Sequence, residues 1–108
     1  MNRVKIVTFV PSSHADTVRL VLGAAGAGKI GKYSYCSFTT LGKGRYKASD
    51  EAKPFIGKAG ESEVVEEERI EVVCERSKAR DVIVAMRQAH PYEEVAFDIY
   101  PIIDELDL

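Results

Sequence analysis

Alternating apolar positions predict a strand at the start of the chain. Within Arg3–Val10, Val4 and Ile6 lie on one face of an extended backbone while Val7 and Phe9 lie on the other, because side chains alternate along a strand. Both faces are therefore apolar. Such a strand needs cover on each side, from the rest of the chain or from another molecule.

A helical period follows over Ser13–Ala25. Ser13 and Asp16 have the capping-box spacing that satisfies free backbone N–H groups at a helix start. Glycines at positions 26, 28 and 31 predict the end of the helix and a tight turn with positive φ angles. Apolar residues recur at the spacing of one helix face, at Val18, Val21, Leu22 and Ala25.

Aromatic and β-branched residues in Lys32–Thr40 predict a second strand. The next segment, Leu41–Glu63, has no sustained period and contains several glycines, so we expect a long loop. Structureless loops of this length are uncommon in compact domains unless they are functional or disordered, which makes this one a candidate site. Val64 and Val65 are expected to form only a short extra strand.

Two strands and a helix complete the pattern. Glu67–Glu75 alternates and predicts a strand, and a helical stripe follows Ser77, the expected N-cap. This helix should end near His90, because the next residue is a proline. Glu94–Ile102 alternates again, and the acidic tail 104–108 is expected to fray. The element order is βαββαβ.

This order predicts an α+β domain of ferredoxin-like fold, an antiparallel sheet with two helices on one face. The 108 residues have the size of a single domain over 1–108, and 45% hydrophobic with 30% charged residues is an ordinary globular balance. The sheet face away from the helices carries apolar side chains, which favours a homo-oligomer. A charge at Val7 or Phe97, whichever faces away from the helices, should break that assembly.

Composition narrows the class of protein. No apolar run reaches the ~20 residues of a membrane-spanning helix, and the N-terminal residues show no export signal, so we expect a cytoplasmic protein with no membrane contact. A pI of about 5.7 and the lack of interleaved basic and aromatic residues argue against nucleic-acid binding. Cys36 and Cys74 form no C-x-x-C pair or zinc cluster, and reduced thiols are expected.

Charge is distributed unevenly along the chain. Residues 26–60 contain seven lysines and arginines, whereas residues 61–75 contain seven glutamates. The basic segment can attract an anion, or it can pair with the acidic segment of its own or a neighbouring chain. Exposed backbone N–H groups beside two cations can hold phosphate or carboxylate, although a flexible hairpin tip would look the same. The candidate residues here are Gly42, Lys43, Gly44 and Arg45.

The glycines of residues 26–31 match G-x-G-x-x-G, and residues 23–29 approach a phosphate-binding loop. A dinucleotide-binding turn follows a strand and opens a helix, so that the helix N-terminus meets the phosphates. Here the glycines follow a helix and precede a strand. Ile30 also stands where a phosphate-binding loop needs a hydroxyl. We therefore expect a tight turn and no nucleotide cofactor.

The segment from His90 to Glu94 combines an imidazole, the Tyr92 phenol and two carboxylates, Glu93 and Glu94. This set can form an acid/base or metal site. Alternatively, His90 caps the helix C-terminus, where the helix dipole favours a cation, and the acids are solvated or paired with the basic segment. His14 is expected at the surface. No Ser/His/Asp order or Cys/His pair indicates an enzyme.

Several segments together resemble a known family. They cover nearly the whole chain, and Ala-His-Pro-Tyr-Glu-Glu with its following strand is the most specific of them. The sequence is similar to the YqfO branch of the Nif-three-like family, whose larger members look like hexameric dinuclear-metal proteins with this unit inserted. The chain resembles a short, stand-alone form. The segments are residues 26–38, 42–44, 54–57, 67–71 and 89–101.

The resemblance implies a PII/CutA-like trimer that packs its sheets around a central axis. The metal ligands of the larger members lie in flanking halves that this sequence lacks, so neither metal chemistry nor a GTP cyclohydrolase activity is carried over. In PII-like relatives small ligands bind between subunits near the long loop. By analogy, Leu41–Gly60 and His90–Glu94 form the candidate site.

Three hypotheses about function follow. The first is a non-catalytic trimeric binding or regulatory module that recognises a small anion or a protein partner. The second is a CutA-like divalent-metal protein using His90, Glu93, Glu94 and Cys36 from adjoining subunits, which metal titration of a His90→Ala variant would test. The third is a small enzyme with its site between subunits, signalled by a strongly perturbed pKa in a cleft.

Overall fold

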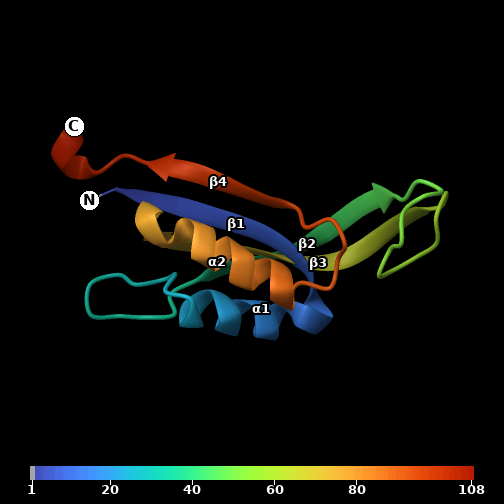
Figure 1. Cartoon of the computed structure of the whole chain (residues 1–108), viewed down its shortest axis with the longest axis horizontal. Coiled ribbons are helices and arrows are strands. Elements are labelled where there is room, and N and C mark those ends of the chain that lie inside the picture. The colour runs from blue at the N-terminus through green and yellow to red at the C-terminus, as the bar shows by residue number, and fades with distance from the viewer. Residues whose placement is uncertain (1) are drawn as a thin grey trace.

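The computed structural model describes residues 2–108. Figure 1 shows two layers, a twisted antiparallel sheet and a pair of helices. The predicted βαββαβ order and ferredoxin-like fold are confirmed, and a short 3-10 turn, η1 (Glu105–Asp107), follows the last strand. The strands are β1 (Arg3–Pro11), β2 (Phe38–Lys47), β3 (Ser62–Glu75) and β4 (Phe97–Ile102); the helices are α1 (Ser12–Ala24) and α2 (Arg76–Ala89).

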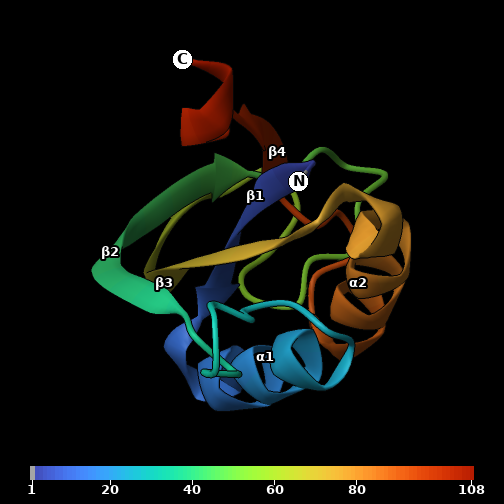
Figure 2. The ribbon, with the colours of Figure 1, turned by 90° about the vertical axis from the view of Figure 1, so that its left-hand side faces the viewer.

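The sheet has the strand order β2-β3-β1-β4. β1 therefore lies in the interior of the sheet, where Ile6 pairs with Val72 of β3 and Ile99 of β4. This position agrees with the apolar character of both faces of β1. Figure 2 shows α1 and α2 together on one side of the sheet, so the opposite face has no helical cover.

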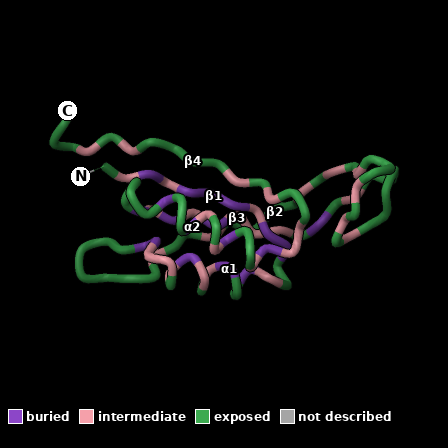
Figure 3. The backbone as a smooth tube through the Cα atoms, viewed as in Figure 1, coloured by how far each residue is buried: buried purple, intermediate pink, exposed green. Residues whose placement is uncertain are grey.

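The hydrophobic core lies between the helices and the central strands. Ile6, Leu22, Ile70 and Met86 are fully buried there. Figure 3 shows buried residues concentrated in β1 and along one side of each helix, whereas most loop residues are exposed or intermediate. The helical stripes predicted from the sequence are thus the faces that the helices bury.

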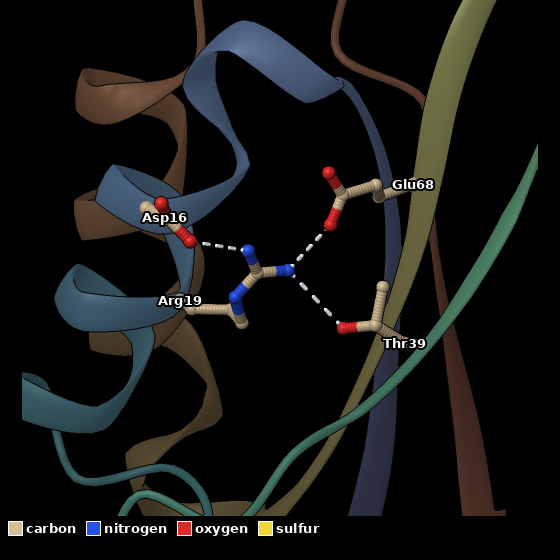
Figure 4. Close-up of polar contacts among 4 residues, drawn as sticks. All are labelled: Asp16, Arg19, Thr39 and Glu68. Atoms are coloured by element: carbon tan, nitrogen blue, oxygen red, sulfur yellow. Dashed lines mark hydrogen bonds and ion pairs between the residues drawn. The ribbon is translucent and has the colours of Figure 1, made fainter.

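Arg19 connects α1 to the sheet (Figure 4). Its Nη1 donates to Oε1 of Glu68 at 2.7 Å and to Oγ1 of Thr39 at 3.2 Å, and its Nη2 donates to Oδ1 of Asp16 at 2.5 Å. These partners come from β3, β2 and α1. The guanidinium therefore holds the first residues of β2 in place against the helix layer.

The second strand begins at Phe38 instead of Lys32, and it continues through Lys47. The preceding residues are bound to the core in another way, because Gly28 donates its N–H to the Val73 carbonyl at 2.7 Å and accepts from the Cys36 N–H at 2.9 Å. The predicted loop 41–63 is consequently wrong in its bounds. Residues 41–47 belong to β2, residues 62–63 belong to β3, and the connection is 48–61.

Neither predicted helix cap forms. α1 begins at Ser12, so Ser13 already lies inside the helix, and its hydroxyl instead contacts Nδ1 of His14 at 2.8 Å. α2 likewise begins at Arg76, one residue before Ser77. In both cases the chain passes directly from a strand into a helix, so no loop remains that could supply a capping side chain. The predicted helix ends are correct to within one residue.

The last strand and the tail also differ from prediction. β4 begins at Phe97 and not at Glu94. The tail forms η1, whose start is stabilised by Asp104, because its carboxylate accepts from the Leu106 N–H at 3.0 Å. Within residues 2–108, no helix is both long and apolar enough to span a membrane.

Candidate ligand-binding site

A hollow of about 830 Å³ lies between the β2–β3 ribbon, the 48–61 loop and the turn that joins α2 to β4. We call it the ribbon hollow. In Figure 1 the ribbon extends beyond the helices and carries the loop at its far end. Four aromatic side chains contribute to the lining, namely Phe9, Tyr46, Phe55 and Tyr92.

Most of the predicted site residues meet at this hollow. Tyr92, Glu93 and Glu94 line it from the α2–β4 turn, opposite the β2 candidates Gly42, Lys43, Gly44 and Arg45. Two predicted residues do not line it. His90 lies directly behind Tyr92, with a ring centroid distance of 5.0 Å, and Cys36 belongs to the segment before β2.

The glycines and cations of β2 occupy strand positions and not a hairpin tip. Gly42 and Gly44 alternate with Lys43 and Arg45 along the strand, so the cations share one face and the glycines the other. A Cβ atom at Gly44 would lie only 1.8 Å from Oε1 of Glu67. The absence of a side chain at Gly44 therefore leaves room for the Glu67 carboxylate.

Glu67 connects the two walls of the hollow. The Tyr92 hydroxyl donates to its Oε2 at 2.8 Å, which joins the α2–β4 turn to β3. Burial raises the pKa of Tyr92 first, and the hydrogen bond to Glu67 raises it further. The phenol therefore stays protonated and acts as a donor at neutral pH.

His90 is buried and makes two hydrogen bonds inside the chain. Its Nδ1 accepts from the Tyr92 N–H at 3.2 Å, and its Nε2 lies 2.7 Å from the Phe9 carbonyl oxygen. A neutral ring with the proton on Nε2 satisfies both contacts. Burial lowers the pKa of His90 from 6.5, although the bond to Phe9 opposes this shift. His90 is the C-cap residue of α2, as predicted, and its backbone N–H donates to the Met86 carbonyl, but burial of the ring favours the neutral form over the expected cation.

The 48–61 loop is attached to the walls of the hollow. The Lys53 N–H donates to Oε1 of Glu93 at 2.7 Å, and the Tyr46 hydroxyl donates to the Ile56 carbonyl. The Phe55 ring contacts the ring of His14 edge-on at 5.2 Å. His14 thus supports the loop from the first turn of α1. The loop is held over one side of the hollow by backbone and ring contacts.

The metal alternative receives no geometric support from a single chain. Both ring nitrogens of His90 are engaged, and one oxygen of Glu93 accepts from Lys53. Across residues 2–108, no three or more His, Cys, Asp or Glu side chains gather in a way that could hold a metal ion. A site shared between adjoining subunits, with His90, Glu93, Glu94 and Cys36, stays a prediction.

Sequence reasoning missed several residues of the hollow. Phe9, Glu67 and Arg69 were assigned only to strands, because alternation shows which side chains share a sheet face but not which distant residues pack against that face. The pairs Phe9 with Arg69 and Pro11 with Glu67 in the β1–β3 register place these three side chains on the face away from the helices. The Arg69 guanidinium lies 5.7 Å from the Phe9 ring centroid. The alternation of glycines and cations in residues 42–45 was the one sequence feature that could have extended the predicted second strand beyond Thr40.

Comparison with known proteins identifies relatives of the chain, although no protein-family model matches it. It is 50% identical over 101 residues to a protein of Halalkalibacterium halodurans named "GTP cyclohydrolase 1 type 2 homolog", and 52% identical over 98 residues to a protein of the same name from Bacillus subtilis. These matches cover 94% and 91% of this chain. The chain spans only 27% and 26% of those relatives, which is about a quarter of their length.

Solved structures give the same result. A Bacillus cereus protein related to NIF3 superimposes with a TM-score of 0.83 at 47% identity, covering 95% of this chain and 26% of that one. CutA from Archaeoglobus fulgidus (TM-score 0.69, 17% identity, 94% and 85% covered) and an ATP complex of B. subtilis GlnK (0.63, 14%, 94% and 82%) share the fold. The fold is thus CutA- and PII-like, and the chain is a homologue of the Nif-three-like (YqfO) proteins over about a quarter of their length.

Proposed function

We propose that the chain is a non-catalytic, oligomeric binding module whose ribbon hollow takes a small anionic ligand with a planar ring. The observation that carries this proposal is the combination of basic and aromatic residues around one hollow, with Arg69 on the same sheet face as Phe9 and Glu67 and with Lys43 and Arg45 on the other face of β2. Guanidinium and ammonium groups bind phosphate and carboxylate, and aromatic rings stack on planar groups. The cations of the lining are Lys43, Arg45, Lys47 and Arg69.

The charge state of the hollow supports an anion. Within residues 2–108, Lys43 and Arg45 make no ion pair and no side-chain hydrogen bond, and both are exposed. Two of the acids are already engaged, Glu67 by Tyr92 and Glu93 by the Lys53 N–H. The lining has four cations, Lys43, Arg45, Lys47 and Arg69, and three carboxylates, Glu67, Glu93 and Glu94, so its formal charge is positive by one.

The oligomer in this proposal forms through the sheet face that no helix covers. Phe38 and Tyr100 project from this face, with 67% and 44% of their surfaces exposed. Val7 lies between them on the same face, whereas Phe97 packs against the helix-side core. A trimer around this face would bury the exposed rings and keep the ribbon hollow at its edge.

Calorimetric titration tests the ligand proposal. Adenosine triphosphate and inorganic phosphate are suitable probes, because one carries a planar ring and the other only the anion. We expect the triphosphate to bind, with Arg45→Glu weakening binding about tenfold or more. Lys58→Glu is the matched control, since Lys58 lies outside the lining. Equal binding by both variants, or no heat with either probe at millimolar concentration, would contradict the proposal.

Light scattering tests the assembly. A trimer has a mass of about three times the 11.9 kDa chain. Tyr100→Glu and Phe38→Glu should each lower this mass, because a charge would be buried in the interface. Leu20→Glu changes a side chain whose exposure, 62%, is close to that of Phe38 but which lies on the helix layer, and it should leave the mass unchanged. A monomeric chain of natural sequence would refute the assembly.

A further inference from the structure

A second hollow, of about 750 Å³, lies between α2 and β4 and shares no lining residue with the ribbon hollow. We call it the α2–β4 groove. Its floor comes from Val4, Phe97, Ile99 and Pro101, and its wall comes from α2. Figure 1 shows α2 running below β1 and β4, with the edge strand at the outside.

The groove exists because α2 packs on β1 and β3, the two central strands. The edge strand β4 extends beyond this cover. Its residues Phe97, Ile99 and Pro101 alternate toward the helix side, yet Ile99 stays 46% exposed and Pro101 is exposed. On the helix, Val84 is 51% exposed. The groove is thus an apolar surface that the chain itself does not cover.

Arginines border this apolar surface. Arg76, Arg80 and Arg87 line the groove, and their spacing of four and seven residues puts them on one side of α2. None of the three forms an ion pair within residues 2–108. The Arg87 guanidinium lies 5.0 Å from the Phe97 ring centroid, which holds one positive charge over the floor. The groove therefore suits a segment that is both apolar and acidic.

The tail of the same sequence has this chemistry. The tail exposes three large apolar side chains that are close together in the chain, and this exposure to water is unfavourable. Ile103 is 73% exposed, Leu106 is 86% exposed and Leu108 is 94% exposed. Acidic Glu105 and Asp107 alternate with the two leucines. In Figure 1 the tail continues past the end of β4, away from the helices. In this position the tail lies outside the groove of its own chain.

We propose that the α2–β4 groove of one copy receives residues 103–108 of a second copy. The dimensions agree. The arginine row from Arg76 to Arg87 spans about 16 Å at the helical rise per residue. When η1 opens into an extended strand, residues 103–108 also span about 16 Å. Leu106 and Leu108 then cover the apolar floor, and Glu105 and Asp107 face the arginines. Each copy has both a tail and a groove, so the contact can repeat from copy to copy.

Fluorescence anisotropy provides the first test. The receiver is the full chain with Leu106→Ser and Leu108→Ser, so that its own tail does not compete. The probe is a fluorescein-labelled peptide of residues 102–108 with an amidated C-terminus. We expect saturable binding that weakens about tenfold or more when Arg76→Glu and Arg80→Glu are added to the receiver. Lys78→Glu, on the same helix but outside the lining, should change binding less than about twofold.

The second test distinguishes a second copy from the chain's own tail. Methyl resonances of Leu106 and Leu108 are recorded in the natural chain over a hundredfold range of concentration. For a second copy, we expect them to shift with concentration, and the Arg76→Glu, Arg80→Glu chain should lack this shift.

Positions that differ from those of the arginine variant at concentrations where light scattering finds a monomer would show the chain's own tail in the groove and overturn the proposal. Positions equal to those of the variant, or a peptide that does not bind the receiver, would overturn it as well. Neither result depends on ligand binding in the ribbon hollow.

Discussion

The hydroxyl of Tyr92 donates a 2.8 Å hydrogen bond to Oε2 of Glu67, and this one contact joins the α2–β4 turn to β3. The two residues lie 25 positions apart in the sequence. Because the same turn carries Glu93, which accepts from the Lys53 N–H, the contact also influences where the 48–61 loop lies. Hydrogen bonds thus connect the strands, the loop and the turn that form the walls of the ribbon hollow.

Replacing Tyr92 with Phe should remove the hydrogen bond to Glu67 and lower the stability of the chain. The variant loses a hydrogen bond to a carboxylate, which typically lowers the free energy of unfolding by about 1–2 kcal/mol. Urea denaturation of the variant and the natural chain measures this change. Tyr33→Phe is the control, because Tyr33 is 75% exposed and should show no change. A Tyr92→Phe chain as stable as the natural one would show that the hydrogen bond is not made in solution.

His90 predicts a dependence of stability on pH. Burial lowers its pKa in the folded chain from the ordinary 6.5, so the unfolded chain binds a proton more readily. The free energy of unfolding should therefore be constant above pH 6.5 and fall as the pH decreases below 6.5, by less than about 1.4 kcal/mol per pH unit. Protonation also places a hydrogen on Nδ1, where the Tyr92 N–H now donates.

Urea midpoints between pH 7.5 and 5.5 measure this effect before most carboxylates titrate. His14→Ala should keep the decrease, whereas His90→Ala should remove it while lowering stability at every pH. A natural chain with the same midpoint at both ends of this range would mean that His90 is not buried as described. The Tyr92 pKa, which is raised, has no influence here, because a phenol of ordinary pKa is also protonated in this range.

Arg19 provides a matched pair of substitutions. Its two carboxylate partners differ in exposure: the Glu68 side chain is 12% exposed, and the Asp16 side chain is fully exposed. Glu68→Gln should reduce the free energy of unfolding by about 1–2 kcal/mol, and Asp16→Asn should reduce it less, because solvent screens the fully exposed Asp16 carboxylate. Thermal denaturation of the two variants compares them directly. If Asp16→Asn had the larger effect, the sheet contact of Arg19 would not be the important one.

The sequence predicted the order of elements because the core follows simple periods. The stripes of both helices and the alternation of β1 and β3 reflect burial on one face, which local spacing reports well. Glycines at 26 and 28 also have the positive φ angles predicted for them, at 108° and 84°. These features depend only on residues that are close in the chain.

The errors arose where distant residues decide the structure. The part of β2 after Thr40 was not predicted, because Gly42 and Gly44 lower the strand propensity of this segment. The strand forms there because it pairs with β3, and the Glu67 carboxylate occupies the space next to Gly44. The orientation of the His90 ring depends on its contact with the Phe9 carbonyl, 81 positions away. Local spacing contains no information about such partners, so the candidate site was found only in its β2 and turn residues.

Gly28 and Gly31 test how the segment before β2 is held. Both have positive φ angles, 84° and 57°, which cost a residue with a side chain about 1 kcal/mol or more. At Gly28 a Cβ would also lie 2.5 Å from the Cys36 carbonyl oxygen and 2.7 Å from its nitrogen, whereas at Gly31 nothing lies within 4 Å. Gly28→Ala should therefore lower the free energy of unfolding by about 3 kcal/mol or more, and Gly31→Ala by about 1 kcal/mol.

Chemical denaturation of the two alanine variants measures both values with the same added atom at each site. Because Gly28 bonds to both Val73 and Cys36, its variant should also expose the amides of residues 28 and 36 to hydrogen exchange, while the Gly31 variant keeps them protected. Equal losses of stability would mean that backbone conformation alone sets the requirement for glycine. A larger loss for Gly28 would show that the close approach of residue 36 fixes the path of the chain into β2.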